Sequence, residues 1–77
     1  KIERGGLVGP RLTALIAFVP PGFDGAQLVV TIDGVQHTTA PVQLGDEHVA
    51  GLAFDQLSRF TAQIITPDGR ALFTTAG

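Results

Sequence analysis

The clearest pattern along the chain is a short β-branched segment that ends at a tight turn. Residues 27–32 (QLVVTI) are followed by Asp33-Gly34 and then by the extended segment 35–39. An Asp-Gly pair between two such segments is the strongest short-range signal of a β-hairpin, because both turn residues must adopt positive φ. The pattern therefore predicts two antiparallel strands joined by a type I′ turn.

A second hairpin is predicted near the C-terminal end. Residues 60–66 (FTAQIIT) alternate apolar and polar positions, and residues 71–75 return after Pro67-Asp68-Gly69. Pro fits the first central position of a type I turn, and Gly supplies the left-handed residue after it. This arrangement is typical of a three-residue hairpin loop.

The first third of the chain contains one strongly apolar segment. Residues 11–19 (RLTALIAFV) carry apolar side chains at both odd and even positions, which predicts a strand that is buried on both faces and ended by Pro20-Pro21-Gly22. Residues 1–10 contain three Gly and one Pro and predict an extended arm or linker.

The central segment leaves two interpretations open. Residues 41–48 are expected to form a polar connector, and alternation within 49–54 predicts a strand. Apolar positions at helical spacing over 49–60, with Asp46 as a candidate N-cap, offer a helix instead. Gly51 weakens a helix, so the strand is favoured.

These segments predict an all-β domain over residues 11–77, a small antiparallel sandwich or barrel of six to seven strands.

An internal repeat supports this fold, because residues 9–40 and 45–76 align at an even shift of 36 residues. Two pseudo-repeated units of three strands each are expected to face one another, and an even shift keeps each residue on its face of the sheet. Nine positions are identical in the two segments: Gly9/Gly45, Ala14/Ala50, Ala17/Ala53, Phe18/Phe54, Ala26/Ala62, Gln27/Gln63, Thr38/Thr74, Thr39/Thr75 and Ala40/Ala76.

Residues 53–75 (AFDQLSRFTAQIITPDGRALFTT) resemble the last three strands of immunoglobulin-like and fibronectin-type-III-like modules. In those families a Leu plug ends one strand, and an aromatic corner residue opens the next. Leu57, Phe60, Ala62 and Ile64 occupy the corresponding places, although the corner residue of the families is usually Tyr. The resemblance implies scaffolding or adhesion, because such modules are common in bacterial surface proteins, phage tails and capsids.

Composition and charge exclude several functional classes. The chain has 77 residues, a formal net charge of −2 and no Cys, which excludes disulfides, zinc-thiolate sites and a cysteine nucleophile. Its five basic residues are scattered, so no nucleic-acid footprint is expected. The longest apolar stretch, 12–19, is too short for a membrane span. Because the chain starts with Lys1, we expect a processed product or a segment of a longer protein. The absence of Cys is compatible with an exported or virion protein, and we expect a location outside the cell or in a virion.

The candidate catalytic and metal-binding groups have simpler explanations. Asp46, Glu47 and His48 are consecutive, so on an extended chain their side chains point alternately and do not converge on a metal ion. Ser58 lies in no nucleophile motif, and the Asp residues beside Gly are explained by turns. We therefore predict no enzyme activity, no catalytic residue, no metal site and no cofactor.

The leading functional interpretation is a structural module that assembles with protein subunits as a homo-oligomer or larger assembly. A domain this small buries limited surface and gains stability from neighbours, and the arm 1–10 is expected to add a strand to a neighbour's sheet. The alternative is a ligand- or carbohydrate-binding module with a concave site between loops 20–25 and 56–61. Phe23, Asp24 and Arg59 are the expected contact residues, with Phe23 either an exposed loop aromatic or a ring tucked over the end of the sandwich.

Overall fold

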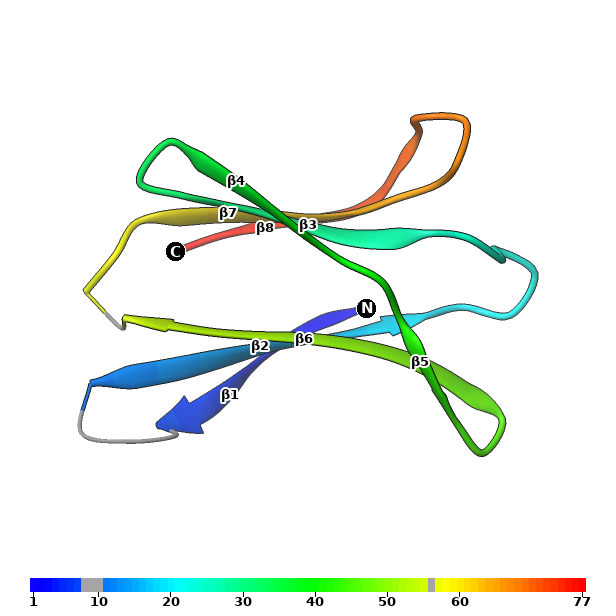
Figure 1. Ribbon diagram of the computed structural model, residues 1–77, viewed down its shortest axis with the longest axis horizontal. Coiled ribbons are helices and arrows are strands. Elements are labelled where there is room, and N and C mark those ends of the chain that lie inside the picture. The colour runs from blue at the N-terminus through cyan, green and yellow to red at the C-terminus, as the bar shows by residue number, and fades with distance from the viewer. Residues whose placement is uncertain (8–10, 56) are drawn as a thin grey trace.

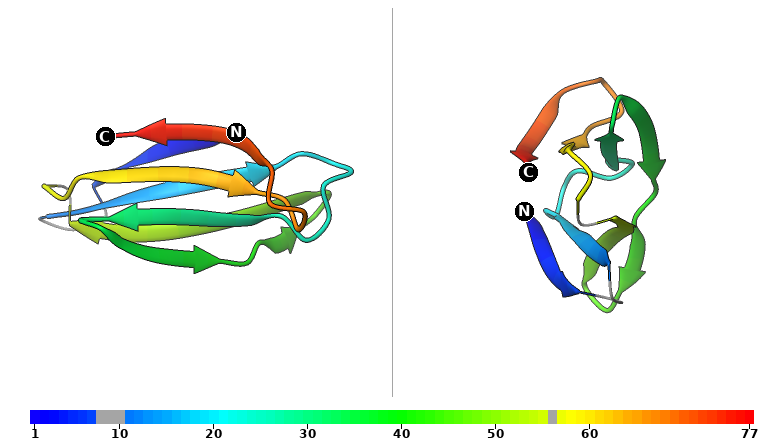
Figure 2. Two further views of the ribbon diagram at one scale, coloured as in Figure 1. Left: turned by 90° about the horizontal axis from the view of Figure 1, so that it is seen from above. Right: turned by 90° about the vertical axis from the view of Figure 1, so that its left-hand side faces the viewer.

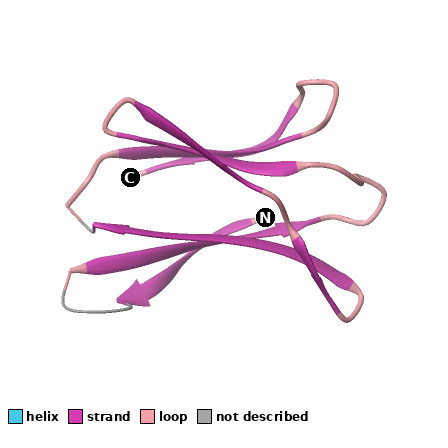
Figure 3. Cartoon of the chain, viewed as in Figure 1, coloured by secondary structure: helices cyan, strands magenta, loops and turns pink. Residues whose placement is uncertain are grey.

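The computed structural model describes residues 1–7, 11–55 and 57–77, and this part of the chain forms strands joined by turns and loops (Figures 1 and 3). The strands are β1 Ile2–Leu7, β2 Leu12–Val19, β3 Gln27–Ile32, β4 Val35–Thr39, β5 Val42–Leu44, β6 Glu47–Asp55, β7 Phe60–Ile65 and β8 Ala71–Ala76. They make two four-stranded antiparallel sheets, in the order β1-β2-β6-β5 (sheet 1) and β4-β3-β7-β8 (sheet 2). The two sheets form a sandwich, which confirms the predicted all-β fold class.

The core lies between the sheets and is built from side chains of alternating residues. The buried apolar residues are Leu15, Ala17 and Val19 on β2, Ala26 just before β3, Leu28 and Val30 on β3, Ala50 and Phe54 on β6, and Phe60, Ala62 and Ile64 on β7. Phe54 and Phe60 meet edge to face with ring centroids 5.0 Å apart, the arrangement favoured by aromatic quadrupoles. Aromatic rings from both sheets therefore close one end of the core.

Residues 2–7 are not a free arm. They form β1, which pairs antiparallel with β2 and places Ile2 opposite Ala17, and Ile2 packs against the core. The prediction of an arm or linker over 1–10 is therefore wrong for residues 2–7, while 8–10 lie outside the described residues. Gly-rich composition weakens a strand locally, and the register with β2 shifts between Arg4 and Leu7, but β2 supplies backbone partners on both sides of this shift.

The expected polar connector 41–48 is also wrong. Val42–Leu44 form β5, and a turn at Gly45-Asp46 leads into β6, with Leu44 opposite Glu47. The strand interpretation of 49–54 is confirmed, and the alternative helix over 49–60 is excluded for the described residues, because β6 pairs with β2 along its length. β1 and β5 account for the difference between the eight observed strands and the six to seven expected.

Both predicted hairpin turns are confirmed. Asp33 and Gly34 have φ values of 49° and 84°, as a type I′ turn requires. In the second hairpin Gly69 has a φ of 89°, and the backbone N–H of Thr66 donates to the carbonyl of Arg70 at 2.9 Å. Local turn chemistry therefore determines the register of both hairpins.

The Thr66 side chain organises the second turn. Its hydroxyl contacts the carboxylate of Asp68, and it accepts a hydrogen bond from the Arg70 N–H at 3.0 Å. The hydrogen bond from Thr66 holds the pKa of Asp68 below its usual value. Because the folded pKa is depressed, the ionised carboxylate contributes stability above the unfolded pKa, and this contribution is lost as the pH falls through the folded pKa.

We therefore expect Asp68→Asn to cause a small loss of stability at neutral pH that disappears in acid. Urea unfolding of both proteins, followed by circular dichroism from about pH 7 to about pH 2, measures this as a difference in midpoint that narrows on acidification. Asp46→Asn, on an exposed turn, is the matched control. A difference between wild type and Asp68→Asn that stays constant with pH would contradict the role assigned to the Asp68 carboxylate.

The two repeat segments are not separate layers of the sandwich. β2 and β6 lie side by side in sheet 1, while β3, β4, β7 and β8 make up sheet 2. The shift of 36 residues preserves the face for Leu28 and Ile64, which are both fully buried. It reverses the face for Ala17, which is buried, and Ala53, which is exposed. The expectation that the shift keeps every residue on its face is therefore wrong for β2 and β6. The expectation of two equivalent units agrees with the strand order, because exchanging each strand with the one four places along the chain leaves both sheets unchanged.

Candidate functional site

The outer face of sheet 1, turned away from the core, is apolar. The pairing places Phe18 opposite Val49 and Val49 opposite Val42, so one apolar row crosses three strands. We call this surface the apolar face; its members are Leu12, Ala14, Ile16 and Phe18 of β2, Val42 and Leu44 of β5, and Val49 and Ala53 of β6. Leu12, Val42 and Leu44 are exposed. The other β2 members of the face, Ala14, Ile16 and Phe18, are half-buried. The core face of β2 is therefore buried, as expected. Its outer face is exposed or half-buried, so the expectation of burial on both faces is wrong for that side.

Two ion pairs lie at the margins of the apolar face. The Lys1 ammonium lies 2.7 Å from the Glu3 carboxylate, and Arg11 lies 3.2 Å from Asp55. The hydrogen bond to Glu3 raises the pKa of Lys1. The outer face of sheet 2 differs, because Thr31, Gln36, Thr38, Thr61, Gln63 and Thr74 share it with few apolar residues. An apolar centre with a polar margin is the anatomy of a protein–protein interface.

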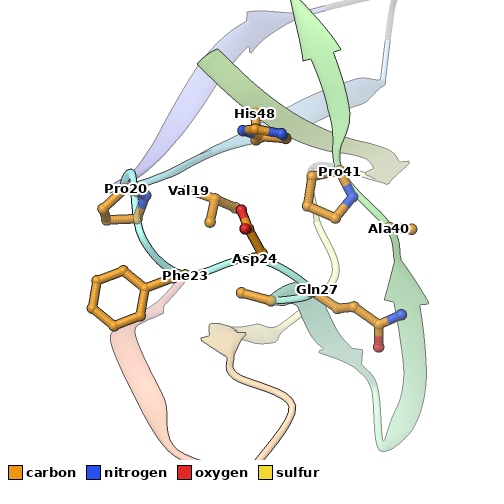
Figure 4. Close-up of a pocket in the computed structure, with 10 residues that line it drawn as sticks. Val19, Pro20, Phe23, Asp24, Gln27, Ala40, Pro41 and His48 are labelled. Atoms are coloured by element: carbon orange, nitrogen blue, oxygen red, sulfur yellow. The ribbon is translucent and has the colours of Figure 1, made fainter. Parts of the chain in front are cut away.

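A cavity of about 350 Å³ opens at one end of the sandwich (Figure 4). Its walls come from the β2–β3 loop, from the connection between β4 and β5, and from the start of β6. The lining residues are Val19, Pro20, Phe23, Asp24, Gly25, Ala26, Gln27, Ala40, Pro41 and His48. Two of the three predicted contact residues, Phe23 and Asp24, therefore lie at one hollow.

The loop that carries Phe23 and Asp24 is fixed by packing on both sides. The Ala26 N–H donates to the Phe23 carbonyl at 3.2 Å, and Gly25 lies close to the ring of Pro67. Phe23 is half-buried, packs against the core, and has the Arg70 guanidinium 5.9 Å from its ring centroid. Its ring therefore covers the end of the sandwich and is not a free loop aromatic.

The cavity presents three kinds of polar group on mostly apolar walls. Asp24 and Gln27 are exposed, and the half-buried His48 projects from β6 toward the opening (Figure 4). A carboxylate, an amide and an imidazole can donate and accept hydrogen bonds from a polar ligand. No group of three or more His, Asp or Glu side chains in residues 1–7, 11–55 and 57–77 is placed to hold a metal ion.

Arg59 lies at the opposite end of the sandwich. Its N–H donates to the Asp33 carboxylate at 3.2 Å, and its carbonyl accepts a hydrogen bond from the Asp33 N–H at 3.0 Å. β2 and β6 run antiparallel, so the loops that follow them emerge at opposite ends (Figure 1). The predicted concave site between loops 20–25 and 56–61 is therefore wrong; Gln56 itself lies outside the described residues.

The residues that carry the immunoglobulin-like resemblance divide into two groups. Phe60, Ala62 and Ile64 are buried on β7. Leu57 is 75% exposed, so it does not fill the place of the Leu plug. Its backbone N–H donates to the Asp55 carboxylate at 2.9 Å, in the turn that follows β6. His48 and Pro41 line the cavity, a place that the sequence did not predict, because both residues belong to the segment expected to be a polar connector.

Comparison with known proteins adds no identity. No protein-family model, no curated protein and no solved structure matches this chain. Within the described residues there is no helix long and apolar enough to cross a membrane.

Proposed function

We propose that this chain is a non-enzymatic structural module of the immunoglobulin-like type that assembles with other protein subunits in a virion or on a bacterial surface. The apolar face is the observation that carries the proposal. Exposed apolar patches with polar margins mark interaction sites, because water leaves the patch when a partner covers it. A second subunit that packs on sheet 1 would bury Leu12, Val42 and Leu44, which are now exposed.

The strand order supports the immunoglobulin-like part of the proposal. Immunoglobulin-type sandwiches place strands A, B, E and D in one sheet and C, F and G in the other, with added C′ strands beside C. Lettering the eight strands in chain order as A, B, C, C′, D, E, F and G gives A-B-E-D and C′-C-F-G for the two sheets. Residues 53–75 resemble the same immunoglobulin-like modules. Because such modules are common in phage and bacterial surface assemblies, we propose that setting.

We expect the isolated chain to self-associate through the apolar face. Sedimentation velocity over a range of protein concentrations measures this as growth of a heavier species. Ala53→Lys places a charge at an exposed position of the face, opposite Ala14, and is expected to weaken association about tenfold or more. Thr61→Lys, on the exposed outer face of sheet 2, is the matched control and should associate like wild type. A wild-type chain that stays monomeric at every concentration would overturn the proposal.

The end cavity favours a second candidate function, a small ligand- or carbohydrate-binding module. Its volume of about 350 Å³ lies within the range of small-molecule sites, and Asp24 at its opening can accept hydrogen bonds from hydroxyl groups. A glycan array tests this function, with binding expected to be lost in Asp24→Ala and kept in Arg59→Ala at the opposite end. Absence of binding by the wild type, or equal binding by both variants, would contradict a site in this cavity.

A further inference from the structure

The four edge strands of the sandwich differ in how they are protected. Exposed edges of sheets pair with other chains unless charges, short length or irregular register prevent it. β1 carries Glu3 and Arg4, β5 has three residues, and β8 follows Arg70 and has an irregular register with β7. β4 has regular register with β3, and the chain contains no Asp, Glu, Lys or Arg from Val35 to Gly45. β4 is therefore the least protected edge.

The edge of β4 is also open to a partner. β4 is the terminal strand of sheet 2, and Figure 2 shows β4 and β5 on the side of the sandwich opposite β1, β8 and the two chain ends. Four of its five residues are exposed, and Val35 is exposed by 58%. This side of the molecule offers an uncharged row of backbone groups.

The hairpin turn fixes which backbone groups of β4 point outward. Ile32 and Val35 flank the two-residue Asp33-Gly34 turn and therefore form a hydrogen-bonded pair. Hydrogen-bonded and non-bonded pairs alternate along an antiparallel ladder. The N–H and C=O groups of Gln36 and Thr38 consequently point away from β3, toward the open side.

We propose that β4 pairs antiparallel with β4 of a second copy of this chain, about a two-fold axis at His37; this inference rests on the proposed assembly function. In that register Gln36 of each copy faces Thr38 of the other and shares two backbone hydrogen bonds with it. The segment 35–39 is thus its own complement: it contains no Asp, Glu, Lys or Arg, and the only side chain that meets its own copy at the axis is His37. A second copy presents the same uncharged edge with the same outward backbone groups of Gln36 and Thr38. Its charge and its hydrogen-bond pattern therefore both match those of β4.

The proposed register brings the two His37 residues together as a non-bonded pair, with Cα atoms about 4.5 Å apart. That distance is within disulfide range. Val35 faces Thr39 of the other copy, so the two Val35 residues are separated by four residues of strand, roughly 14 Å. The wild-type chain has no Cys, so single-cysteine variants report this geometry without background.

Oxidation of His37→Cys is expected to give covalent dimers at least about tenfold faster than oxidation of Val35→Cys or Thr39→Cys alone. A mixture of Val35→Cys and Thr39→Cys should cross-link to a heterodimer at a rate close to that of His37→Cys. Non-reducing electrophoresis over time measures all four rates. Equal rates for His37→Cys and Val35→Cys would overturn the proposal, because random collision predicts them.

A backbone variant tests the hydrogen bonds directly. Thr38→Pro removes an N–H that β3 does not use, so the fold is expected to persist while pairing fails. In the His37→Cys background it should slow cross-linking about tenfold or more, whereas Thr38→Val keeps the N–H and should leave the rate unchanged. Circular dichroism checks folding of each variant, and the cysteine pairs above decide the question if Thr38→Pro unfolds.

The outcomes separate the edge from the wider function. Self-association of the wild type that is weakened by Ala53→Lys, without preferential cross-linking at position 37, overturns the β4 pairing and leaves the assembly function in place. A monomeric wild type without cross-linking at position 37 overturns both. Preferential cross-linking at 37, lost in Thr38→Pro, supports the pairing.

Discussion

Leu28→Ala is expected to lower the free energy of unfolding by about 3 kcal/mol. Leu28 is fully buried at the centre of sheet 2, opposite Ile64 on β7. Truncation removes apolar contacts and leaves a cavity that a rigid sandwich cannot close. Four of the eleven core residues are Ala, so few large side chains hold the two sheets together. For a chain of 77 residues the whole stability is roughly 4–12 kcal/mol, so the loss is a large fraction.

Urea unfolding followed by far-ultraviolet circular dichroism measures this loss, since the chain has no Trp or Tyr. Protein concentration must be held constant because self-association adds apparent stability. Leu57→Ala is the matched control: the same atoms are removed from a side chain that is 75% exposed, and the change should stay within about 0.5 kcal/mol. Similar small losses in the two variants would contradict the burial of Leu28 in the core, and similar large losses would contradict the exposure of Leu57.

The contrast between these two leucines shows what the sequence determines. Segments such as 27–39 and 60–75 are specified locally, because Asp33-Gly34 and Pro67-Asp68-Gly69 demand particular backbone angles. The alternation around Leu28 and Ile64 then assigns their face. Leu57 has the same local composition as a core residue, but its position depends on the turn at Asp55, which alternation does not reveal.

The elements that the sequence missed depend on partners far along the chain. β1 contains Gly-Gly and forms a strand because β2 lies beside it. β5 has only three residues, Val42–Leu44, so its alternation is too short to predict a strand by itself. The Gly45-Asp46 turn was the available signal, since Gly-Asp between extended segments is one of the hairpin pairs.

The same reasoning explains the partial success at the end cavity. Phe23 and Asp24 lie in one loop, so the Pro-Pro-Gly-Phe-Asp-Gly segment suffices to place them together. Arg59 lies in loop 56–61, which was expected to lie beside loop 20–25. The antiparallel pairing of β2 with β6, a tertiary feature, sends the loops to opposite ends.

Gly25→Ala is expected to destabilise the fold by about 2–4 kcal/mol and to disturb the end cavity. Gly25 has a φ of +84°, where an L-residue costs roughly 1–2 kcal/mol. A Cβ at this position would also lie 2.9 Å from Cγ of Pro67, so the β2–β3 loop and the second hairpin must separate. Gly34→Ala isolates the first contribution, because Gly34 has the same φ and no atom within 4 Å of such a Cβ.

Urea unfolding of both glycine variants should therefore show a larger loss for Gly25→Ala than for Gly34→Ala. The difference is assigned to Pro67 by a double-mutant cycle, since Pro67→Ala removes the Cγ atom that the new Cβ would meet. Gly25→Ala should cost less in the Pro67→Ala background than in wild type, approaching the loss seen for Gly34→Ala. Equal losses in the two backgrounds would show that the β2–β3 loop does not pack on the second hairpin as the structure has it, and the walls of the cavity around Asp24 would then need another support.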